Sequence, residues 1–182
     1  MNLLPGLFHF YIPSFLKKKG LKELFISTAA AFNKRIPSLK GLSFENSLLK
    51  YALFTKEEVE KYIVDGGDPL NLHKGLNEHA ILFGKKLRKI FFIKSFKKAV
   101  SIFELLYSFI GIDLKISGEG EISVKKCFFS NYYTPNVCAI ISAIDSGVFE
   151  GISGGCRIEF RQRITEGNDC CKARIILKDR VL

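Results

Sequence analysis

The chain has 182 residues, of which 47% are hydrophobic and 17 are phenylalanine, a composition too apolar for an intrinsically disordered protein. No apolar run reaches the roughly 18 residues that cross a bilayer. The apolar start at residues 1–16 precedes Lys17–Lys19, the reverse of a secretory signal, so we expect a cytoplasmic protein whose five cysteines stay free thiols.

The net charge of +10 is concentrated in the first part of the chain. Residues 1–110 hold 18 Lys or Arg against 9 Asp or Glu, whereas residues 111–182 hold 10 against 9. The length suits one compact unit. We therefore expect a single domain over 1–182, with a basic helical part at 1–112 and a strand-rich part at 113–182.

The densest positive charge lies between Lys85 and Lys98, interleaved with isoleucine and phenylalanine. This pattern favours a solvated helix face over a nucleic-acid contact. An anionic membrane surface stays open as a partner, through this stretch and through the N-terminal segment. The N-terminal segment has two interpretations, an amphipathic segment packed on the domain or an interfacial foot.

Apolar side chains three and four residues apart predict a series of helices in the first part. Thr55 and Glu58 have the spacing of a capping box, which would start a new helix. The two glycines between Asp65 and Pro69 predict the next break. The predicted helices are Leu21–Phe32, Ser43–Phe54, Lys56–Val64, Leu70–Leu87 and Ile93–Ile110.

After Gly111 the pattern becomes strand-rich. Thr134 and Pro135 are typical of a helix start, and the helix is expected to end near Val148. Strands are predicted at Ile122–Phe129, Cys156–Ile164 and Cys171–Leu177, the last two joined by the turn Thr165–Asp169. The predicted fold class is α+β, with a helical N-terminal half packed on a small antiparallel sheet and a C-terminal β-α-β-β unit.

Alternation along the last two strands predicts their faces. Cys156 and Cys171 are expected to face inward, whereas Arg157, Arg161 and Arg163 are expected on the outer polar face. The alternative is that these arginines receive a substrate carboxylate.

All five cysteines lie between positions 127 and 171. Cys138, Ser142 and Asp145 are four and three residues apart, which puts them on nearly one helix face. With Cys127 and the run Glu166–Cys171, this region resembles the L-2-amino-thiazoline-4-carboxylic acid hydrolase family. Ser142 stands where that family's pattern has a cysteine. The same ending is more weakly similar to 4-vinyl reductase-like ligand-binding domains.

The stronger resemblance implies a hydrolase that opens a small cyclic amidine by adding water. This reaction requires a base or a metal to activate the water and a donor for the leaving nitrogen. Catalytic candidates by this resemblance are Cys127, Cys138, Asp145 and Cys171. Substrate-binding candidates are Ser142, Glu166 and Asp169. No cofactor is expected; zinc is less favoured because the sequence has no Cys-x-x-Cys.

Each candidate also has a purely structural interpretation, because buried thiols pack as small apolar groups and acidic residues shape turns. Whether the protein is an enzyme therefore stays open. The alternatives are a non-catalytic module for a small-molecule ligand and, after it, a basic adaptor for nucleic acid or membrane. The sequence does not define an oligomeric state.

Overall fold

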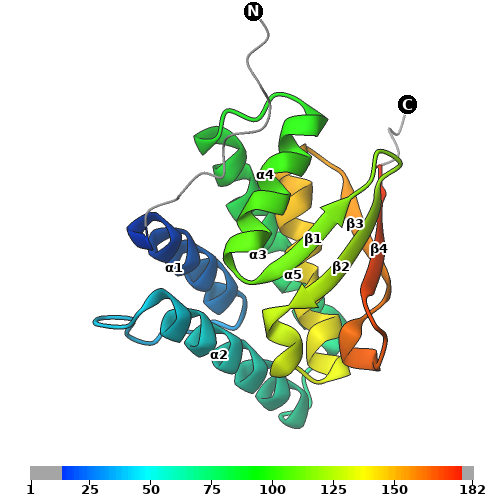
Figure 1. Cartoon of the computed structure of the whole chain (residues 1–182). Helices are drawn as coiled ribbons and strands as arrows, with labels where there is room; N and C mark the ends of the chain where they lie inside the picture. The colour runs from blue at the N-terminus through cyan, green and yellow to red at the C-terminus, as the bar shows by residue number, and fades with distance from the viewer. Residues whose placement is uncertain (1–13, 178–182) are drawn as a thin grey trace, which may run out of the picture.

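The computed structural model describes residues 14–177 (Figure 1). Within this range the chain forms five α-helices and one four-stranded antiparallel sheet, which confirms the predicted α+β class. In chain order the elements are α1 (Ser14–Ala31), α2 (Phe44–Val64), α3 (Pro69–Ile90), α4 (Phe96–Phe109), β1 (Ile112–Ile116), β2 (Glu121–Cys127), the short 3-10 helix η1 (Phe128–Asn131), α5 (Pro135–Ser153), β3 (Arg157–Gln162), the 3-10 helix η2 (Ile164–Glu166) and β4 (Cys171–Ile176).

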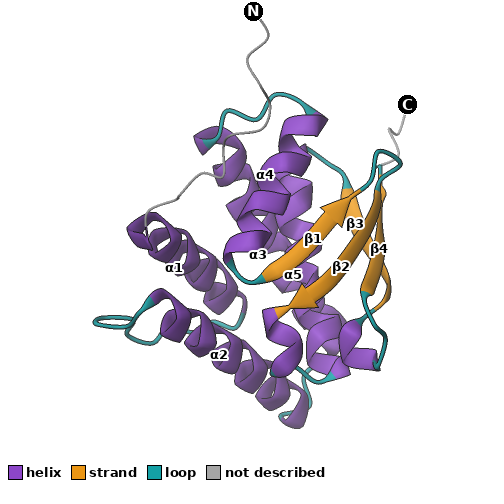
Figure 2. Ribbon diagram, in the orientation of Figure 1, coloured by secondary structure: helices purple, strands orange, loops and turns teal. Residues whose placement is uncertain are grey.

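The sheet has the strand order β1-β2-β4-β3, so the last strand lies between two earlier ones. Figure 2 shows the helices gathered on one side of the sheet, while its other face is open. Side chains alternate between the two faces of the sheet along each strand. Ile122 and Val124 of β2 and Ala173 of β4 are buried against the helices, and the residues between them face solvent.

Helix α2 corrects the prediction of a capping box at Thr55. The helix runs without a break from Phe44 to Val64, and its N-cap is Ser43, whose side chain accepts from the Asn46 backbone amide. Thr55 is buried in mid-helix, where its hydroxyl contacts the backbone carbonyl of Tyr51 and the Tyr133 hydroxyl. These buried partners satisfy the threonine inside the helix, so no new helix start is needed.

Helix α5 is longer than predicted. Thr134 caps its start as expected, but the helix continues past Val148 to Ser153 and ends at Gly154, whose φ of 90° closes it in the left-handed region. By length and composition this helix could cross a membrane, yet 67% of its most apolar 18-residue stretch is buried inside the fold. It is the core helix of a globular fold.

Glycines let α5 cross α3 at very short range. A Cβ on Gly151 would lie 2.4 Å from the Ile81 carbonyl oxygen, and one on Gly84 would lie 2.4 Å from the Val148 carbonyl oxygen. Gly147 is equally restricted by Asn77. Gly84, Gly147 and Gly151 therefore form a packing surface for the helix that carries the candidate site. Of the three, only Gly151 lies beyond the predicted end of that helix near Val148.

Two features of the sheet differ from the prediction. Strand β1 was not predicted, although Ile112 and Leu114 alternate with charged residues and pair with β2. In addition, a register shift between Phe160 and Gln162 interrupts the β3–β4 pairing, and the chain then turns into η2. Because of this bulge the predicted outward position of Arg163 is wrong: its side chain is only 17% exposed.

Candidate functional site

The three helix residues predicted to share a face do so on α5. Ser142 is buried, and Cys138 and Asp145 are partly exposed. The Ser142 hydroxyl donates to the Ala139 carbonyl at 2.7 Å and accepts from Nη2 of Arg163 at 3.2 Å. Helix α5 thus presents a hydroxyl, a thiol and a carboxylate to the start of η2.

Asp145 is the centre of this region. The Tyr107 hydroxyl of α4 donates to Oδ1 of Asp145 at 2.6 Å. Burial raises the pKa of Asp145 to about 6, although the Tyr107 hydrogen bond and the Arg163 charge act in the opposite direction. The residue keeps some accessible surface, but its carboxyl group is largely surrounded by protein. Asp145 therefore changes its charge near neutral pH.

The structure brings three of the predicted cysteines near Asp145. Cys127 ends β2, Cys138 lies on α5 and Cys171 begins β4, and the Asp145 charge raises the pKa of all three. Burial is the main cause in each case and raises the pKa of Cys127 to about 12. The backbone amide of Ile164 also donates to Sγ of Cys171 at 3.4 Å. These thiols are protonated at neutral pH, which makes them poor nucleophiles.

Arg163 belongs to this region, although the prediction placed it on an outer polar face. Beyond its bond to Ser142, its Nη1 lies 3.4 Å from Oε1 of Glu166, and its guanidinium carbon lies 5.1 Å from the centre of the Phe160 ring. Burial lowers the pKa of His73, and the Arg163 charge lowers it further. The sequence indicated the inward position of Arg163 only by placing it directly before the turn, where the alternation of the strand ends.

Two buried polar atoms beside the cluster have no hydrogen-bond partner within the described residues, Nε of Arg163 and Oγ1 of Thr165. The Thr165 hydroxyl faces the Cys138 thiol and lowers its pKa. The two groups nevertheless lie outside normal hydrogen-bond geometry, so Oγ1 of Thr165 is left without a hydrogen bond. Buried polar groups usually have a partner, so two such atoms together are unusual.

Three buried tyrosines complete this region, and none was predicted. Tyr107 contacts Asp145 directly, whereas the Tyr51 and Tyr133 hydroxyls pair with Thr28 and Thr55 at 3.0 and 2.6 Å. Burial raises the pKa of all three phenols, and the Asp145 charge adds to this. We call the following residues the Asp145 cluster: Asp145, Tyr107, Cys127, Cys138, Cys171, Ser142, Arg163 and Thr165.

The other two predicted substrate-binding residues lie at the surface. Glu166 is exposed, and its Oε2 accepts from the Arg163 backbone amide at 2.9 Å, which fixes the start of η2. Asp169 is exposed on the turn before β4. Among the described residues, no group of three His, Cys, Asp or Glu side chains is arranged to hold a metal ion.

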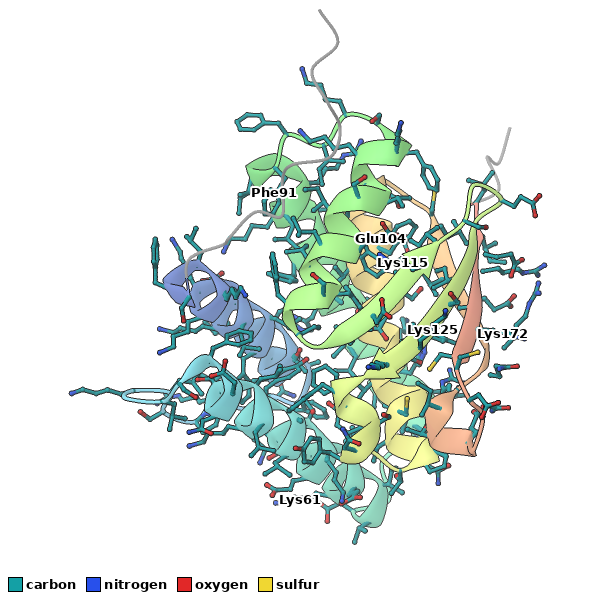
Figure 3. All side chains as sticks on the ribbon, viewed as in Figure 1. Lys61, Phe91, Glu104, Lys115, Lys125 and Lys172 are labelled. Carbon is teal, nitrogen blue, oxygen red and sulfur yellow. The ribbon has the colours of Figure 1, made fainter. Side chains whose placement is uncertain are left out.

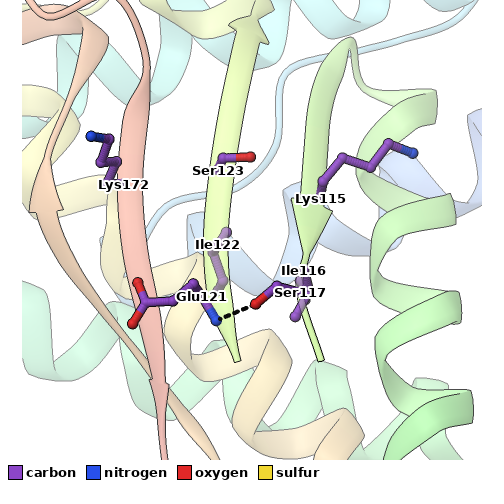
Figure 4. Close-up of a pocket in the computed structure, with 7 residues that line it drawn as sticks. All are labelled: Lys115, Ile116, Ser117, Glu121, Ile122, Ser123 and Lys172. Carbon is purple, nitrogen blue, oxygen red and sulfur yellow. Dashed lines mark hydrogen bonds between the residues drawn. The ribbon is translucent and has the colours of Figure 1, made fainter. Parts of the chain in front are cut away.

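Two surface hollows lie away from the Asp145 cluster. One, of about 370 Å³, is on the open face of the sheet and is lined by Lys115, Ser117, Glu121, Ser123 and Lys172 (Figure 4). The lysines point apart, and the Glu121 backbone amide donates to the Ser117 hydroxyl at 3.1 Å. The other, of about 110 Å³, is lined by α2 and the chain after α1. Neither is lined by the cysteines.

No family model and no curated protein matches this sequence. Two solved structures resemble the fold. A trafficking protein particle complex subunit 3 from Naegleria fowleri, covalently bound to palmitic acid, aligns with 19% identity and a TM-score of 0.57 over 74% of this chain and 96% of that one. A vinyl-4-reductase family protein from Methanocaldococcus jannaschii aligns with 18% identity and a TM-score of 0.43 over 94% of this chain and 99% of that one.

At these identities the likeness concerns the fold alone. The second structure belongs to the kind of protein to which the sequence showed its weaker resemblance, but its TM-score is too low to carry an argument. Neither structure is described as a hydrolase. The resemblance to the thiazoline hydrolases therefore stays an expectation from the sequence.

Proposed function

We propose that this chain is a non-catalytic module that binds a small molecule at the Asp145 cluster, through a carboxylate or a similar hydrogen-bond acceptor on the ligand. The observation that carries the proposal is the pair of buried donors, Nε of Arg163 and Oγ1 of Thr165, which have no partner within the described residues. A buried donor without an acceptor is unfavourable by about 1–3 kcal/mol. An acceptor group on a ligand would remove this cost for both atoms.

The charges around the two donors define the kind of ligand. Arg163 already contacts Glu166 and the Ser142 hydroxyl, and the Asp145 carboxyl lies beside it. Because burial raises the pKa of Asp145, a ligand carboxylate near it would favour the protonated form of Asp145 further. The guanidinium could then receive one negative ligand charge beside a protonated Asp145, while Glu166 stays paired with Nη1 of Arg163.

The thiols support binding over catalysis. Cys127 and Cys138 line the same region with raised pKa values, so they act as small, polarisable apolar contacts. Both keep partial exposure, as do Asp145 and Arg163, so the edge of the cluster reaches the surface. Nε of Arg163 and Oγ1 of Thr165 are themselves buried, so a ligand must displace neighbouring side chains to reach them. An apolar ligand body next to the thiols, with its acceptor at Arg163, fits this distribution.

Long-chain acids are the first ligands to test, because a structure with a similar fold is covalently bound to palmitic acid. The free acid tests the non-covalent binding proposed for this chain. Thermal unfolding of the full chain should be followed with palmitate and with short carboxylates such as butyrate. A ligand at 100 times its Kd adds about 2.7 kcal/mol of stability, which corresponds to a rise in Tm of roughly 5–10 °C.

Matched variants make the test specific. Arg163→Gln and Thr165→Val should each abolish most of the shift. Arg161→Gln on the open face of β3 should keep it, because Arg161 lies 3.9 Å from Glu121 and away from the cluster. Equal shifts in all three variants would reject the proposed site. Thr165→Val keeps the side-chain shape, so it remains informative if Arg163→Gln unfolds.

A hydrolase acting on a small heterocyclic or sulfur-containing substrate is the second candidate. It is favoured by one observation, the pKa of about 6 for Asp145, which suits a general base near neutral pH. The protonated thiols weigh against a cysteine nucleophile. Incubation with 2-amino-thiazoline-4-carboxylate would distinguish the candidates: turnover that Asp145→Asn abolishes supports the hydrolase, and binding without turnover supports the module.

A further inference from the structure

The turn between α3 and α4 lies at one end of the molecule, at the top of Figure 1. Large apolar side chains at this turn are exposed. We call residues 89–98 the α3–α4 tip; Figure 3 labels Phe91 within it. Phe92 is 76% exposed, Ile90 is 56% exposed and Phe96 is 46% exposed. Together they form an exposed apolar patch across the turn and the two helix ends beside it. Of the three, Phe96 also packs the edge of its ring against the buried Phe149.

Phe92 also has a backbone conformation that a bulky residue rarely adopts. Its φ is 49°, in the left-handed region where glycine or asparagine usually ends a helix. The turn itself is well bonded: Ile93 donates to the Arg88 carbonyl at 3.0 Å, and Nζ of Lys98 donates to the Phe92 carbonyl at 3.2 Å. A phenylalanine here strains the backbone and leaves its ring in solvent, so it contributes little to folding. A role in binding accounts for both features.

Positive charge surrounds this patch. No Asp or Glu occurs between Glu78 and Glu104. Lys89, Lys94 and Lys97 are exposed, and none of them forms an ion pair within the described part of the chain. A partner for the tip must therefore be negatively charged and must accept apolar side chains between the charges.

An anionic membrane surface meets both requirements. Lysines at a membrane interface contact the phosphates of the headgroups, while phenylalanine and isoleucine enter the boundary with the acyl chains. Nucleic acid would satisfy the lysines, and its bases could stack on Phe92, but it would leave the aliphatic Ile90 in water. The lysine-rich composition alone did not distinguish these partners; the exposed side chains at the turn do.

We propose that the α3–α4 tip docks this protein on membranes that contain anionic lipids, with Phe92 as the inserted side chain and Lys89, Lys94 and Lys97 at the headgroups. This inference is independent of the ligand proposed for the Asp145 cluster. It rests on the described turn and not on residues 1–13, where the other membrane contact suggested by the sequence lies outside the described residues.

Flotation of the full chain with vesicles tests the proposal. Vesicles of phosphatidylcholine with 30% phosphatidylserine should bind the protein, and pure phosphatidylcholine should bind it at least tenfold more weakly. Phe92→Asn should weaken binding to the anionic vesicles by about tenfold or more, because burying one phenylalanine contributes that much. The matched control is Leu70→Asn at the opposite end of α3, a side chain 78% exposed, which should leave binding unchanged.

A charge-matched pair tests the lysines. Lys94→Glu with Lys97→Glu should reduce binding by at least twentyfold. The same double reversal at Lys125 and Lys126, which are exposed on β2, should have less than a threefold effect. Unchanged binding of Phe92→Asn would overturn the proposal, and so would equal effects of the two double reversals. Salt-sensitive binding to single-stranded RNA with no binding to anionic vesicles would overturn it in favour of nucleic acid.

Discussion

The Asp145 cluster and the α3–α4 tip depart from the usual distribution of side chains in opposite ways. The cluster places a carboxyl group, a guanidinium and a hydroxyl in the interior, with two polar atoms unsatisfied. The tip places phenylalanine and isoleucine in water between lysines. Buried polar groups and exposed apolar patches are the informative exceptions in a folded protein. We propose a partner for each region, and the two partners differ. The Asp145 cluster would bind a small molecule with an acceptor group, and the α3–α4 tip would bind a lipid surface.

The largest effect that would test this contrast concerns thiol reactivity. Because burial raises the pKa of Cys127 to about 12, its thiolate population near pH 8 is lower than that of an ordinary cysteine by about 1000-fold. Alkylation by iodoacetamide, followed residue by residue by mass spectrometry, should label Cys127 correspondingly slowly. Rapid labelling of Cys127 in the folded protein would show that the cluster holds a reactive thiol and would return the hydrolase to first place.

The next effect concerns the helix crossing that supports the cluster. Gly151→Ala would push a Cβ to 2.4 Å from the Ile81 carbonyl oxygen and should destabilise the protein by about 3 kcal/mol. The control is Gly75→Ala on α3, where a Cβ meets nothing within 4 Å and should stabilise the helix by about 0.5–1 kcal/mol. Urea unfolding measures both. If the two variants behave alike, the close crossing is wrong.

Asp145→Asn should stabilise the protein above pH 6. The pKa of Asp145 is raised by burial from 3.8 to about 6, so the folded state binds this proton more tightly than the unfolded state. The stabilising contribution of the protonated group is complete below about pH 4 and is lost as the pH rises through about 6.

The asparagine variant should therefore exceed the native chain by about 1–3 kcal/mol at pH 8 and by little at pH 4. The side-chain oxygen of asparagine can still accept from Tyr107. Urea unfolding at the two pH values measures the difference, and equal destabilisation at both would contradict a buried, ionisable Asp145.

The smallest effect belongs to the tip. Phe92→Asn should raise the free energy of unfolding by about 1 kcal/mol, because asparagine tolerates the left-handed conformation at φ 49° better than phenylalanine. The same variant should lose membrane binding, so stability and binding would change in opposite directions. A fall in stability would mean that the Phe92 ring contributes to the fold after all.

The sequence predicted those parts of the fold and site that depend on local pattern. The helix start at Thr134, the shared face of Cys138, Ser142 and Asp145, and the inward parity of Cys171 all follow from spacing along one element. The α+β class followed from the change of pattern near Gly111.

What the sequence missed depends on contacts between distant segments. Tyr107 reaches Asp145 across 38 positions, and Thr55 meets Tyr133 across 78. No periodicity indicates such pairs. Arg163 was assigned to the wrong face because a single bulge reverses strand parity. The end of α5 was predicted too early, before Gly151, since only the neighbouring helix α3 reveals why a small residue is needed there.

The most direct measurement of the central claim is isothermal titration calorimetry with a carboxylate ligand found in the thermal-unfolding screen. We expect stoichiometric binding to the native chain and to Arg161→Gln. Binding to Arg163→Gln and to Thr165→Val should be at least tenfold weaker. Binding of equal strength to all four proteins would contradict the claim, because the buried donors of Arg163 and Thr165 would then have no part in holding a ligand.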